Sequence, residues 1–239
     1  MEATGQVSRS GDCTLVIMAK APRPGRVKTR LAECLPGPAI IALYRCLFDD
    51  TMALARSLSK VEIAIMCPES DVNELRQMTG DAISVVAQKN EGLAAGLTSV
   101  FAHFAASARK RVIAFNSDSP HLPRTVLETA FETLAAHDLV VGPTNDGGYY
   151  LVGAKASHPA LFSNDGMGTT TALERLLMQA RTLELSVGFA DPFYDVDIAD
   201  DLARLAVELR LAPAKAPRTA EWLKQWEFQA AQSRTGTKL

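Results

Sequence analysis

Short apolar runs alternate with segments of helical periodicity along most of this chain, and this alternation constrains the fold more than any other feature. The runs have the length of strands and lack the polar alternation of a strand with one wet face. They lie at residues 14–18, 62–67, 83–87, 111–115 and 139–143. Helical spacing occupies residues 38–58, 71–78 and 123–136, and a glycine-bearing segment at 88–96 leads into a helix ending near residue 108. The pattern predicts an α/β protein with a doubly wound, mostly parallel sheet and helices on both faces.

The second half of the chain continues this pattern with one tight turn. Its predicted strands are residues 149–153 and 184–189, and its predicted helices are residues 169–180, 198–210 and 221–232. Threonines are able to cap the helix at 169, and Asp200 and Asp201 lie near the positive end of the helix at 198. Asn145 to Gly148 tolerate positive φ angles. The strands on either side of this turn are therefore predicted to form a hairpin or a bend.

The chain length and composition indicate one compact protein. At 239 residues the chain is long enough for one core, and no composition shift marks a second domain. We expect a flexible N-terminal tail at 1–12, a main domain at 13–211, and a linker and C-terminal helix at 212–239 packed on the same domain. No signal-peptide core or bilayer-spanning run is found in the sequence. Four scattered cysteines indicate reduced thiols, so we expect a cytoplasmic protein, with a homodimer left open.

A turn crowded with cations follows the first apolar run. It carries Lys20, Arg23, Arg26, Lys28 and Arg30 with no acidic residue among them. Such like charges are compatible with a bound anion, because phosphate oxygens accept charge-assisted hydrogen bonds from Arg and Lys. The alternative is a solvated basic turn. Ligands of open α/β sheets bind beyond the carboxyl ends of strands, which favours the anion site. A net charge of −2 argues against a nucleic-acid partner or an anionic membrane surface.

Acidic residues follow other predicted strands. Asp118 comes after the run at 111–115, and Asp195 and Asp197 come after the run at 184–189. Carboxylates at a sheet edge suit a divalent cation that bridges phosphates. Asp195 and Asp197 point the same way if the backbone is extended, since side chains alternate with period two. The alternatives are a turn for Asp118 and a helix N-cap for Asp197.

Asp146 lies in the sequence Asn-Asp-Gly-Gly, which is most often a plain turn. The flanking glycines would also let a ligand approach closely, so contact with an acceptor or a ribose hydroxyl is the functional alternative. The chain has no Walker A sequence, no G-x-G-x-x-G after a strand and no G-x-S-x-G. What remains is phosphate held by cationic side chains and a metal, as in nucleotidyl or glycosyl transfer.

Four motifs, in order along the chain, resemble those of the DUF2064 glycosyltransferase-like family. They are M-A-K-A-P-R-P-G-R-V-K-T-R-L at 18–31, S-D-S-P at 117–120, G-P-T-N-D-G-G-Y-Y-L at 142–151, and Y-D-V-D at 194–197 followed by D-D-L at 200–202. That family belongs to the GT-A nucleotide-diphospho-sugar transferase superfamily, alongside molybdenum-cofactor and phospholactate guanylyltransferases. The resemblance covers residues 14–211. It implies a GT-A-type, Rossmann-like sheet that binds the nucleotide over its first half.

The resemblance also implies roles for individual residues. The basic loop is its phosphate-binding signature, and Asp118 holds the metal with a late aspartate, for which Asp197 is a better match than Asp195. The predicted catalytic residues are Lys28 and Asp146. The predicted nucleotide-binding residues are Ala19, Lys20, Gly25, Arg26, Lys28, Arg30, Gln88 and Asn116.

We therefore predict a transferase that depends on Mg²⁺ or Mn²⁺ and transfers a glycosyl group from a nucleotide-diphospho-sugar to a small-molecule acceptor. The first alternative is a nucleotidyltransferase of the guanylyltransferase type, which releases pyrophosphate from a nucleoside triphosphate. The same cations and metal would serve both reactions. The second alternative is a protein that binds nucleotides on the same scaffold without catalysis.

Overall fold

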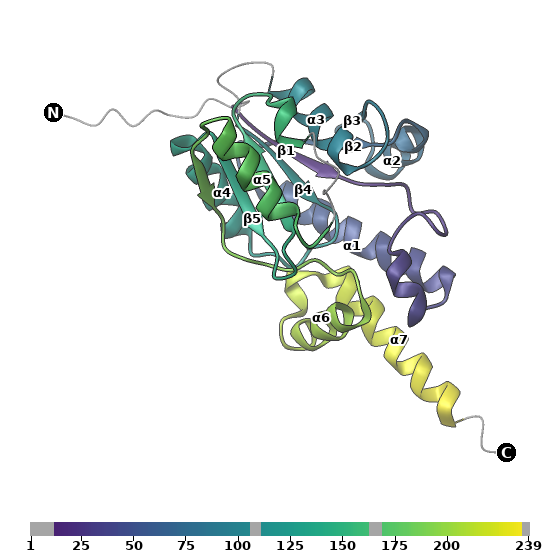
Figure 1. Ribbon diagram of the computed structural model, residues 1–239. Helices are drawn as coiled ribbons and strands as arrows, with labels where there is room; N and C mark the ends of the chain where they lie inside the picture. Colours follow the sequence, from purple (N-terminus) through teal and green to yellow (C-terminus); the bar gives the residue numbers. More distant parts are fainter. Residues whose placement is uncertain (1–11, 106–110, 163–168, 236–239) are drawn as a thin grey trace.

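A seven-stranded sheet forms the centre of the protein (Figure 1). The computed structural model describes residues 12–105, 111–162 and 169–235. In spatial order the sheet runs β3-β2-β1-β4-β6-β5-β7. The strands are β1 (Cys13–Met18), β2 (Glu62–Cys67), β3 (Ser84–Ala87), β4 (Arg111–Asn116), β5 (Leu139–Pro143), β6 (Tyr149–Ala154) and β7 (Val187–Phe189). Only β6 runs antiparallel to its neighbours among these strands, so the expected mostly parallel sheet is confirmed.

Helices cover both faces of this sheet, as the apolar strands require. They are α1 (Gly37–Ser57), α2 (Val72–Thr79), α3 (Leu93–Phe104), α4 (Arg124–Ala136), α5 (Ala172–Thr182), α6 (Ala199–Leu211) and α7 (Pro217–Thr235). Buried side chains of α1, α2 and α4 form one core layer with the sheet. Buried side chains of α3 and α5 form the other layer. The sheet is therefore packed on both faces, which explains why its strands are nearly continuous in apolar residues.

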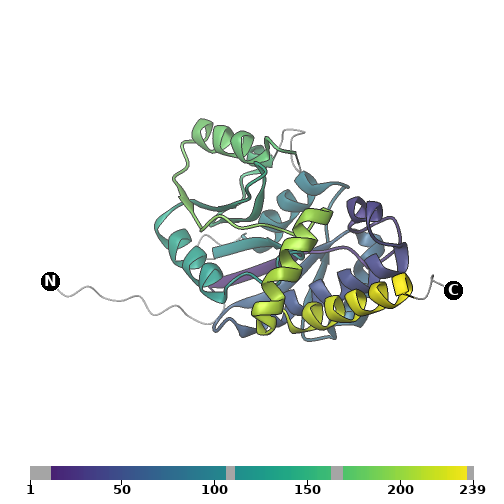
Figure 2. The same cartoon turned by 90° about the horizontal axis from the view of Figure 1, so that it is seen from below.

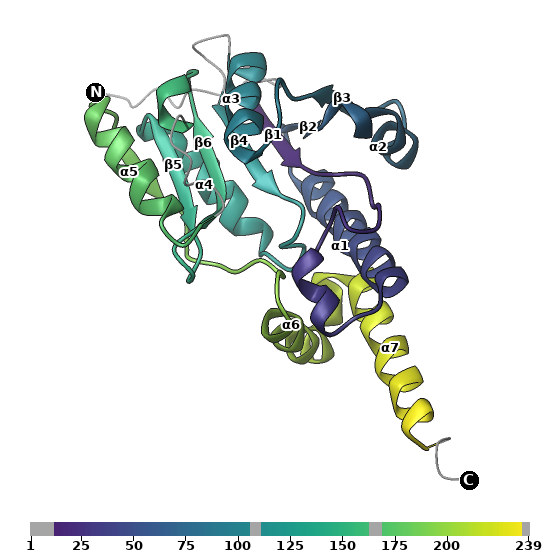
Figure 3. The ribbon, with the colours of Figure 1, turned by 45° about the vertical axis from the view of Figure 1, so that its right-hand side comes forward.

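A third apolar cluster lies outside these two layers and joins α6 and α7 to α1. Views from below and from the side show α7 running beside α1 at the edge of the body (Figures 2 and 3). The buried Asp50 of α1 accepts hydrogen bonds from Arg218 N at 3.2 Å and Thr219 N at 2.8 Å. Its carboxylate thus satisfies free amides in the first turn of α7 and compensates the positive end of that helix. No helix in the described ranges is long and apolar enough to cross a membrane.

The structure corrects several predicted boundaries. β7 begins at Val187, three residues late, because Glu184 adopts a left-handed φ of 55° and Leu185 N still bonds Ala180 O after α5. α5 begins at Ala172, and Thr171 before it makes no side-chain cap. α7 begins within the predicted linker. Residues 1–11 of the predicted tail and the predicted helical end at 106–108 lie outside the described residues.

The register of the sheet brings the carboxyl ends of the parallel strands to one edge. Met18 at the end of β1 pairs with Asn116 at the end of β4. The loop after β1 and the S-D-S-P sequence after β4 therefore begin side by side. β5 and β6 form a hairpin, the first of the two predicted alternatives, and β6 also pairs antiparallel with β4, so the turn 144–148 opens at the same edge.

Candidate active site

A lysine from the basic loop joins two aspartates at this edge of the sheet. Lys28 Nζ lies 2.5 Å from Asp118 Oδ2 and 3.5 Å from Asp197 Oδ1. The second oxygen of Asp197 accepts a hydrogen bond from Arg30 Nη1 at 2.9 Å. The ion pairs connect residues 90 and 167 positions apart in sequence. They form a charged row at the point where the β1 and β4 loops meet.

Lys28 is held in this position by an uncommon backbone conformation and by burial. Its φ of 48° and ψ of 40° are left-handed, a conformation that is rare outside glycine and recurs at functional sites. Only 4% of its side chain is exposed. Burial disfavours the ammonium form, but the carboxylates of Asp118 and Asp197 outweigh it and raise the pKa of Lys28. The lysine is therefore a fixed positive charge.

The late aspartates reach the site because the chain after β7 crosses back over the sheet edge. Val196 N donates to Asp118 O at 3.2 Å, and Ser119 Oγ donates to Tyr194 O at 3.0 Å. These bonds place Asp195 and Asp197 beside Asp118. Burial raises the pKa of Asp195 to about 6; Lys28 lowers it and Asp118 raises it. Three carboxyl groups thus converge around one ammonium.

Asp197 does not serve as the helix cap that was the alternative for it. The N-cap of α6 is Ile198. Asp201 Oδ2 accepts hydrogen bonds from Asp197 N and Ile198 N, each at 3.0 Å. Asp201 therefore satisfies the free amides at this end, and the carboxylate of Asp197 faces Lys28 and Arg30 instead.

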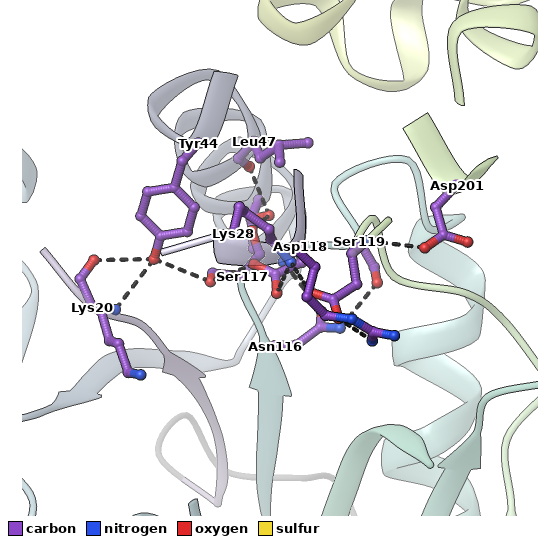
Figure 4. A network of polar contacts seen from close by, with 12 residues as sticks. Lys20, Lys28, Tyr44, Leu47, Asn116, Ser117, Asp118, Ser119 and Asp201 are labelled. Carbon is purple, nitrogen blue, oxygen red and sulfur yellow. Dashed lines mark hydrogen bonds and ion pairs between the residues drawn. The ribbon is translucent and has the colours of Figure 1, made fainter. Parts of the chain in front are cut away.

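Tyr44 of α1 connects the β1 loop to the β4 loop (Figure 4). Its hydroxyl accepts a hydrogen bond from Lys20 N at 3.2 Å and donates to Lys20 O at 3.0 Å. It also lies 3.4 Å from Ser117 Oγ, which in turn donates to Asp118 Oδ1 at 2.9 Å. Burial raises the pKa of Tyr44 to about 12, so the phenol is neutral and able to donate. The contacts position Asp118 relative to the loop.

A cavity of about 550 Å³ opens over the first half of the sheet beside these residues. Lys20, Arg26 and Lys28 lie on its wall. Its lining also includes Met66 and Pro68 at the end of β2, and Gln88, Glu91 and Gly92 in the loop after β3. Gln88 Nε2 donates to Asn90 O and Gly92 O, which fixes this loop. The volume is in the range of small-molecule sites.

A second cavity of about 300 Å³ lies over the other half of the sheet. It shares Asp118 and Asp197 with the first cavity. Arg30, Asn116, Thr144, Asp146, Gly148 and Asp195 are among its lining residues. Asp146 Oδ1 accepts hydrogen bonds from Thr144 Oγ1 at 2.5 Å and Gly148 N at 3.2 Å. The shared aspartates thus separate a cation-lined cavity from a carboxylate-lined cavity.

The structure brings nearly all the predicted site residues to these two cavities. The first is lined by Ala19, Lys20, Arg26, Lys28 and Gln88, and the second by Arg30, Asn116, Asp146 and Asp195. Gly25 lines neither cavity; its φ of 70° instead permits the turn of the loop.

Arg23 differs from the other loop cations, because it is paired outside the site. Its guanidinium contacts Asp71 at 3.1 Å and Glu74 at 3.0 Å. Arg23, Lys28 and Arg30 all form ion pairs, and those of Arg23 lie outside the two cavities. The pairing of Arg23 could not be predicted from the loop alone, because both partners lie about 50 residues further along the chain.

Sequence reasoning missed Tyr44 and Thr144 as site residues. Helical spacing placed Tyr44 on the apolar face of its helix, and the structure does bury it there. The available signal was its hydroxyl, because a buried tyrosine usually needs a hydrogen-bond partner.

Asp118 and Asp197 fit a divalent cation as a pair of carboxylate ligands. Both face the same cationic centre, Lys28 Nζ, and both line the junction of the cavities. Mg²⁺ is commonly bound by one or two carboxylates, with substrate phosphates and water as its other ligands. Within residues 12–105, 111–162 and 169–235, no three His, Cys, Asp or Glu side chains form a complete metal-binding group. The pair therefore suits a metal that shares its ligands with a nucleotide.

Comparisons with known proteins agree with the family suggested by the motifs. The model of the family described as "Uncharacterized protein conserved in bacteria (DUF2064)" matches residues 51–169. The resemblance to this family is thereby confirmed. The matched segment includes Asp118 and the turn at Asp146, and it excludes the basic loop and Asp197.

The chain is also similar to proteins with assigned or proposed reactions. It is 26% identical over 216 residues to a 2-phospho-L-lactate guanylyltransferase of Methanothermobacter thermautotrophicus, covering 89% of this chain and 91% of that protein. A proposed nucleotide-diphospho-sugar transferase from Desulfovibrio desulfuricans G20 superposes with a TM-score of 0.84 at 25% identity, covering 93% of this chain and 98% of that one. A Mycobacterium tuberculosis H37Rv protein solved as a complex with manganese has a TM-score of 0.52 at 19% identity, covering 82% and 98%.

These similarities confirm the predicted fold and the predicted class of enzyme. The fold is the α/β fold of the Desulfovibrio desulfuricans structure, and the protein is an enzyme of the transferase class. The manganese complex supports the fold alone at its level of identity.

Proposed function

We propose that this protein is a metal-dependent nucleotidyltransferase that joins the nucleoside monophosphate part of a nucleoside triphosphate to a small-molecule acceptor and releases pyrophosphate. This reverses the order of the two transferase hypotheses drawn from sequence. The observation that carries the proposal is the set of cations on the wall of the first cavity, Lys20, Arg26 and Lys28. The guanylyltransferase relative, similar along most of both chains, supports the same reaction.

The charge of the first cavity matches a triphosphate better than a diphosphate. Lys28 already neutralises Asp118 and part of Asp197. Neither Lys20 nor Arg26 has a side-chain ion pair with another residue of the described ranges, although both line the cavity. A triphosphate carries about two more charges than the diphosphate of a nucleotide sugar, and Arg and Lys are the usual ligands of phosphate oxygens. These two cations would hold the part that leaves as pyrophosphate.

Each group in the site has a role in this reaction. Lys28 would bind a non-bridging phosphate oxygen and stabilise the charge that develops during transfer. Asp118 and Asp197 would hold Mg²⁺ or Mn²⁺, which neutralises phosphate charge when bound. Tyr44 and Ser117 keep Asp118 in place. The second cavity would place the acceptor on the other side of the transferred phosphate.

Glycosyl transfer remains the second candidate, because the two cavities also suit a nucleotide sugar and its acceptor. The 25% identical structural relative, a proposed nucleotide-diphospho-sugar transferase, favours it. Non-catalytic nucleotide binding is the third candidate; it would be recognised by ordinary nucleotide affinity without turnover of any donor.

The leaving group separates the candidates. The purified protein with Mg²⁺ or Mn²⁺ is incubated with GTP, CTP, UTP or ATP and an acceptor mixture, and pyrophosphate is measured. Parallel reactions contain UDP- or GDP-sugars, and the nucleoside diphosphate is measured. We expect pyrophosphate from at least one triphosphate and no diphosphate from the sugars. Diphosphate release alone would establish glycosyl transfer in its place.

The metal assignment has its own test. Asp118→Asn should weaken Mn²⁺ binding in the presence of a nucleotide about tenfold or more, since a carboxylate ligand is lost. Asp138→Asn is the matched control, because Asp138 bonds Ser186 away from both cavities. Unchanged Mn²⁺ binding by Asp118→Asn would show that the assignment is wrong.

A further inference from the structure

We propose that the second cavity binds an acceptor without a phosphate group and that a hydroxyl of this acceptor is the nucleophile. The inference rests on the proposed nucleotidyl transfer and concerns its second substrate. It is carried by the separation of charge between the two cavities and by the fixed carboxylate of Asp146.

Cations and carboxylates are divided between the two cavities. The charged residues that line the first cavity alone are Lys20, Arg26, Lys28 and Glu91. Those that line the second alone are Arg30, Asp146 and Asp195. Asp118 and Asp197 line both cavities, and their negative charges are balanced by Lys28 or by a metal. Positive charge thus prevails in the cavity for the triphosphate and negative charge in the other.

The one cation of the second cavity among the described residues is already engaged. Arg30 Nη1 donates to Asp197 Oδ2 at 2.9 Å, and the guanidinium is 66% exposed on the rim. A phosphate in this cavity would meet Asp146 and Asp195 with only this arginine to balance it. Like charges brought together cost several kcal/mol at a binding surface. A phosphorylated acceptor is therefore disfavoured, in contrast with the curated relative, which is named for 2-phospho-L-lactate.

Asp146 is arranged to receive a proton from a hydroxyl. Its Oδ1 is occupied by Thr144 Oγ1 and Gly148 N. Its Oδ2 has no hydrogen-bond partner in residues 12–105, 111–162 and 169–235, and the residue lines the cavity. A phosphate nucleophile is already ionised at neutral pH and needs no base, whereas a hydroxyl gains from one. The carboxylate therefore suits an alcohol or a polyol.

The step balances without a further reactant. The acceptor oxygen forms a bond to the α-phosphorus, and the bond from that phosphorus to the bridging oxygen of the β-phosphate breaks. Pyrophosphate takes the bonding electron pair, and the hydroxyl proton passes to Asp146 Oδ2 and then to water. The products are the nucleoside monophosphate ester of the acceptor and pyrophosphate. Asp146 is thus a catalytic residue in this proposal, and Thr144 is a positioning residue.

Paired acceptors test the inference. Glycerol, D-ribose, D-glucose and myo-inositol are each compared with a monophosphate of the same compound, in the presence of the active triphosphate and metal. We expect pyrophosphate release with a kcat/KM about tenfold or more higher for the phosphate-free member of a reacting pair. Release that is equal or faster with the phosphorylated members overturns the inference, as does release with none of the probes.

The same pairs distinguish this failure from failure of the proposed function. If the reaction is glycosyl transfer, nucleotide sugars release diphosphate and triphosphates release no pyrophosphate; the ranking within each pair is then measured on the diphosphate. A preference for phosphate-free members in that assay would leave the acceptor class intact while nucleotidyl transfer fails.

A variant pair tests the role of Asp146. Asp146→Asn should lower kcat about 10²-fold with the affinity for the triphosphate unchanged, since general bases contribute about 10²–10⁴. The neighbouring Asn145→Ala, outside both cavity linings, should change neither value by more than about twofold. An equal loss in both variants, or an unchanged kcat for Asp146→Asn, would contradict a proton-accepting role.

Discussion

Arg23 and Lys28 are two cations of the same loop, five positions apart, yet they have different surroundings. Arg23 turns away from the cavities and pairs with Asp71, the N-cap of α2, and with Glu74 in its first turn. Asp71 also accepts a hydrogen bond from Ala21 N at 3.0 Å, so this contact fastens the beginning of the loop to the body. Lys28 pairs with carboxylates that follow β4 and β7, at the junction of the two cavities. The loop is thus anchored at Ala21 and Arg23, whereas Lys28 lies where it can meet a ligand.

This difference shows that the partners of a cation determine its role, and that these come from other parts of the chain. Arg23 can lose its partners only if the loop moves. Lys28 can exchange a carboxylate for a phosphate oxygen, especially when a divalent cation takes over the carboxylates. Mutation of each cation tests whether anchoring of the loop and ligand binding are separate roles.

The largest expected effect is on catalysis. Lys28→Met should lower kcat/KM for the triphosphate about 10²–10³-fold, because removing one fixed group that stabilises transferring charge commonly has this effect. Steady-state pyrophosphate release measures it. Arg23→Met is the control and should stay within about threefold of the wild type. Similar losses in the two variants would mean that Arg23 and Lys28 act as one unit in catalysis.

The pH dependence of stability should be independent of Arg23. His121 is fully buried between Phe193 and Tyr194, and neither ring nitrogen has a hydrogen-bond partner in the described residues. Burial lowers the pKa of His121 to about 3, with Lys215 and Arg204 acting in the same direction. The unfolded chain therefore binds a proton at His121 more readily than the folded protein does. The free energy of unfolding falls as the pH drops below about 6.5, and the loss is complete near the pKa of His121 in the folded protein.

By this linkage His121 contributes a loss of about 2 kcal/mol between pH 7 and pH 5, and the raised pKa of Asp195 acts in the opposite direction. Urea unfolding at pH 7 and pH 5 measures it. His121→Phe should reduce the difference, whereas Arg23→Met should keep it. If His121→Phe retains the full acid loss, another group is responsible.

Arg23→Met should affect stability instead of catalysis. We expect the free energy of unfolding to fall by about 1–2 kcal/mol. This is less than the cost of breaking a fully buried ion pair, because the Arg23 side chain is 40% exposed. The remaining bonds of Asp71, from Ala21 N and Ser70 Oγ, limit the effect. Chemical unfolding of this variant beside Arg124→Met, an exposed helical pair, provides the comparison. Equal stability of the two variants would contradict the anchoring role.

The smallest effect is expected at Tyr44, which links the β1 loop to the β4 loop. Tyr44→Phe removes the hydroxyl that bonds the Lys20 backbone, which should cost about 1 kcal/mol of stability. Asp118 also loses part of its support through Ser117, so the KM for the metal–nucleotide complex should rise a few fold. Thermal unfolding and kinetics on the same sample measure both. A change in neither would remove Tyr44 from the positioning network.

The sheet was predictable because its strands are apolar on both faces and its helices have clear periodicity. β2 and β5 have the predicted bounds, and Arg111–Asn116 is the central strand of the seven. β7 was overextended, since nothing in the apolar pattern reveals the left-handed turn at Glu184. α7 was predicted to begin four residues too late, because its start depends on Asp50, a residue far away in sequence.

The site was predictable as far as the rule on strand ends applies. Asp118 and Asp197 were expected at one edge of the sheet, and the structure places both against Lys28. The rule could not tell which loop cations are paired elsewhere, as Arg23 is. It also could not identify Tyr44, whose spacing marks only an apolar helix face. The roles of Arg23 and Tyr44 both depend on partners that lie far away in sequence.

Titration with a nucleoside and its triphosphate tests most directly whether Lys28 binds phosphate and Arg23 does not. In the presence of Mg²⁺, wild type, Lys28→Met and Arg23→Met are each titrated with guanosine and a nonhydrolysable analogue of GTP, or with the corresponding pair for another preferred base. We expect Lys28→Met to weaken the analogue about tenfold or more, with the nucleoside affinity unchanged, because a phosphate contact of a charged group contributes about 1.5–3 kcal/mol. Arg23→Met should match the wild type for both ligands. Loss of analogue affinity in Arg23→Met as large as in Lys28→Met, or none in Lys28→Met, would contradict the assignment of phosphate binding to Lys28.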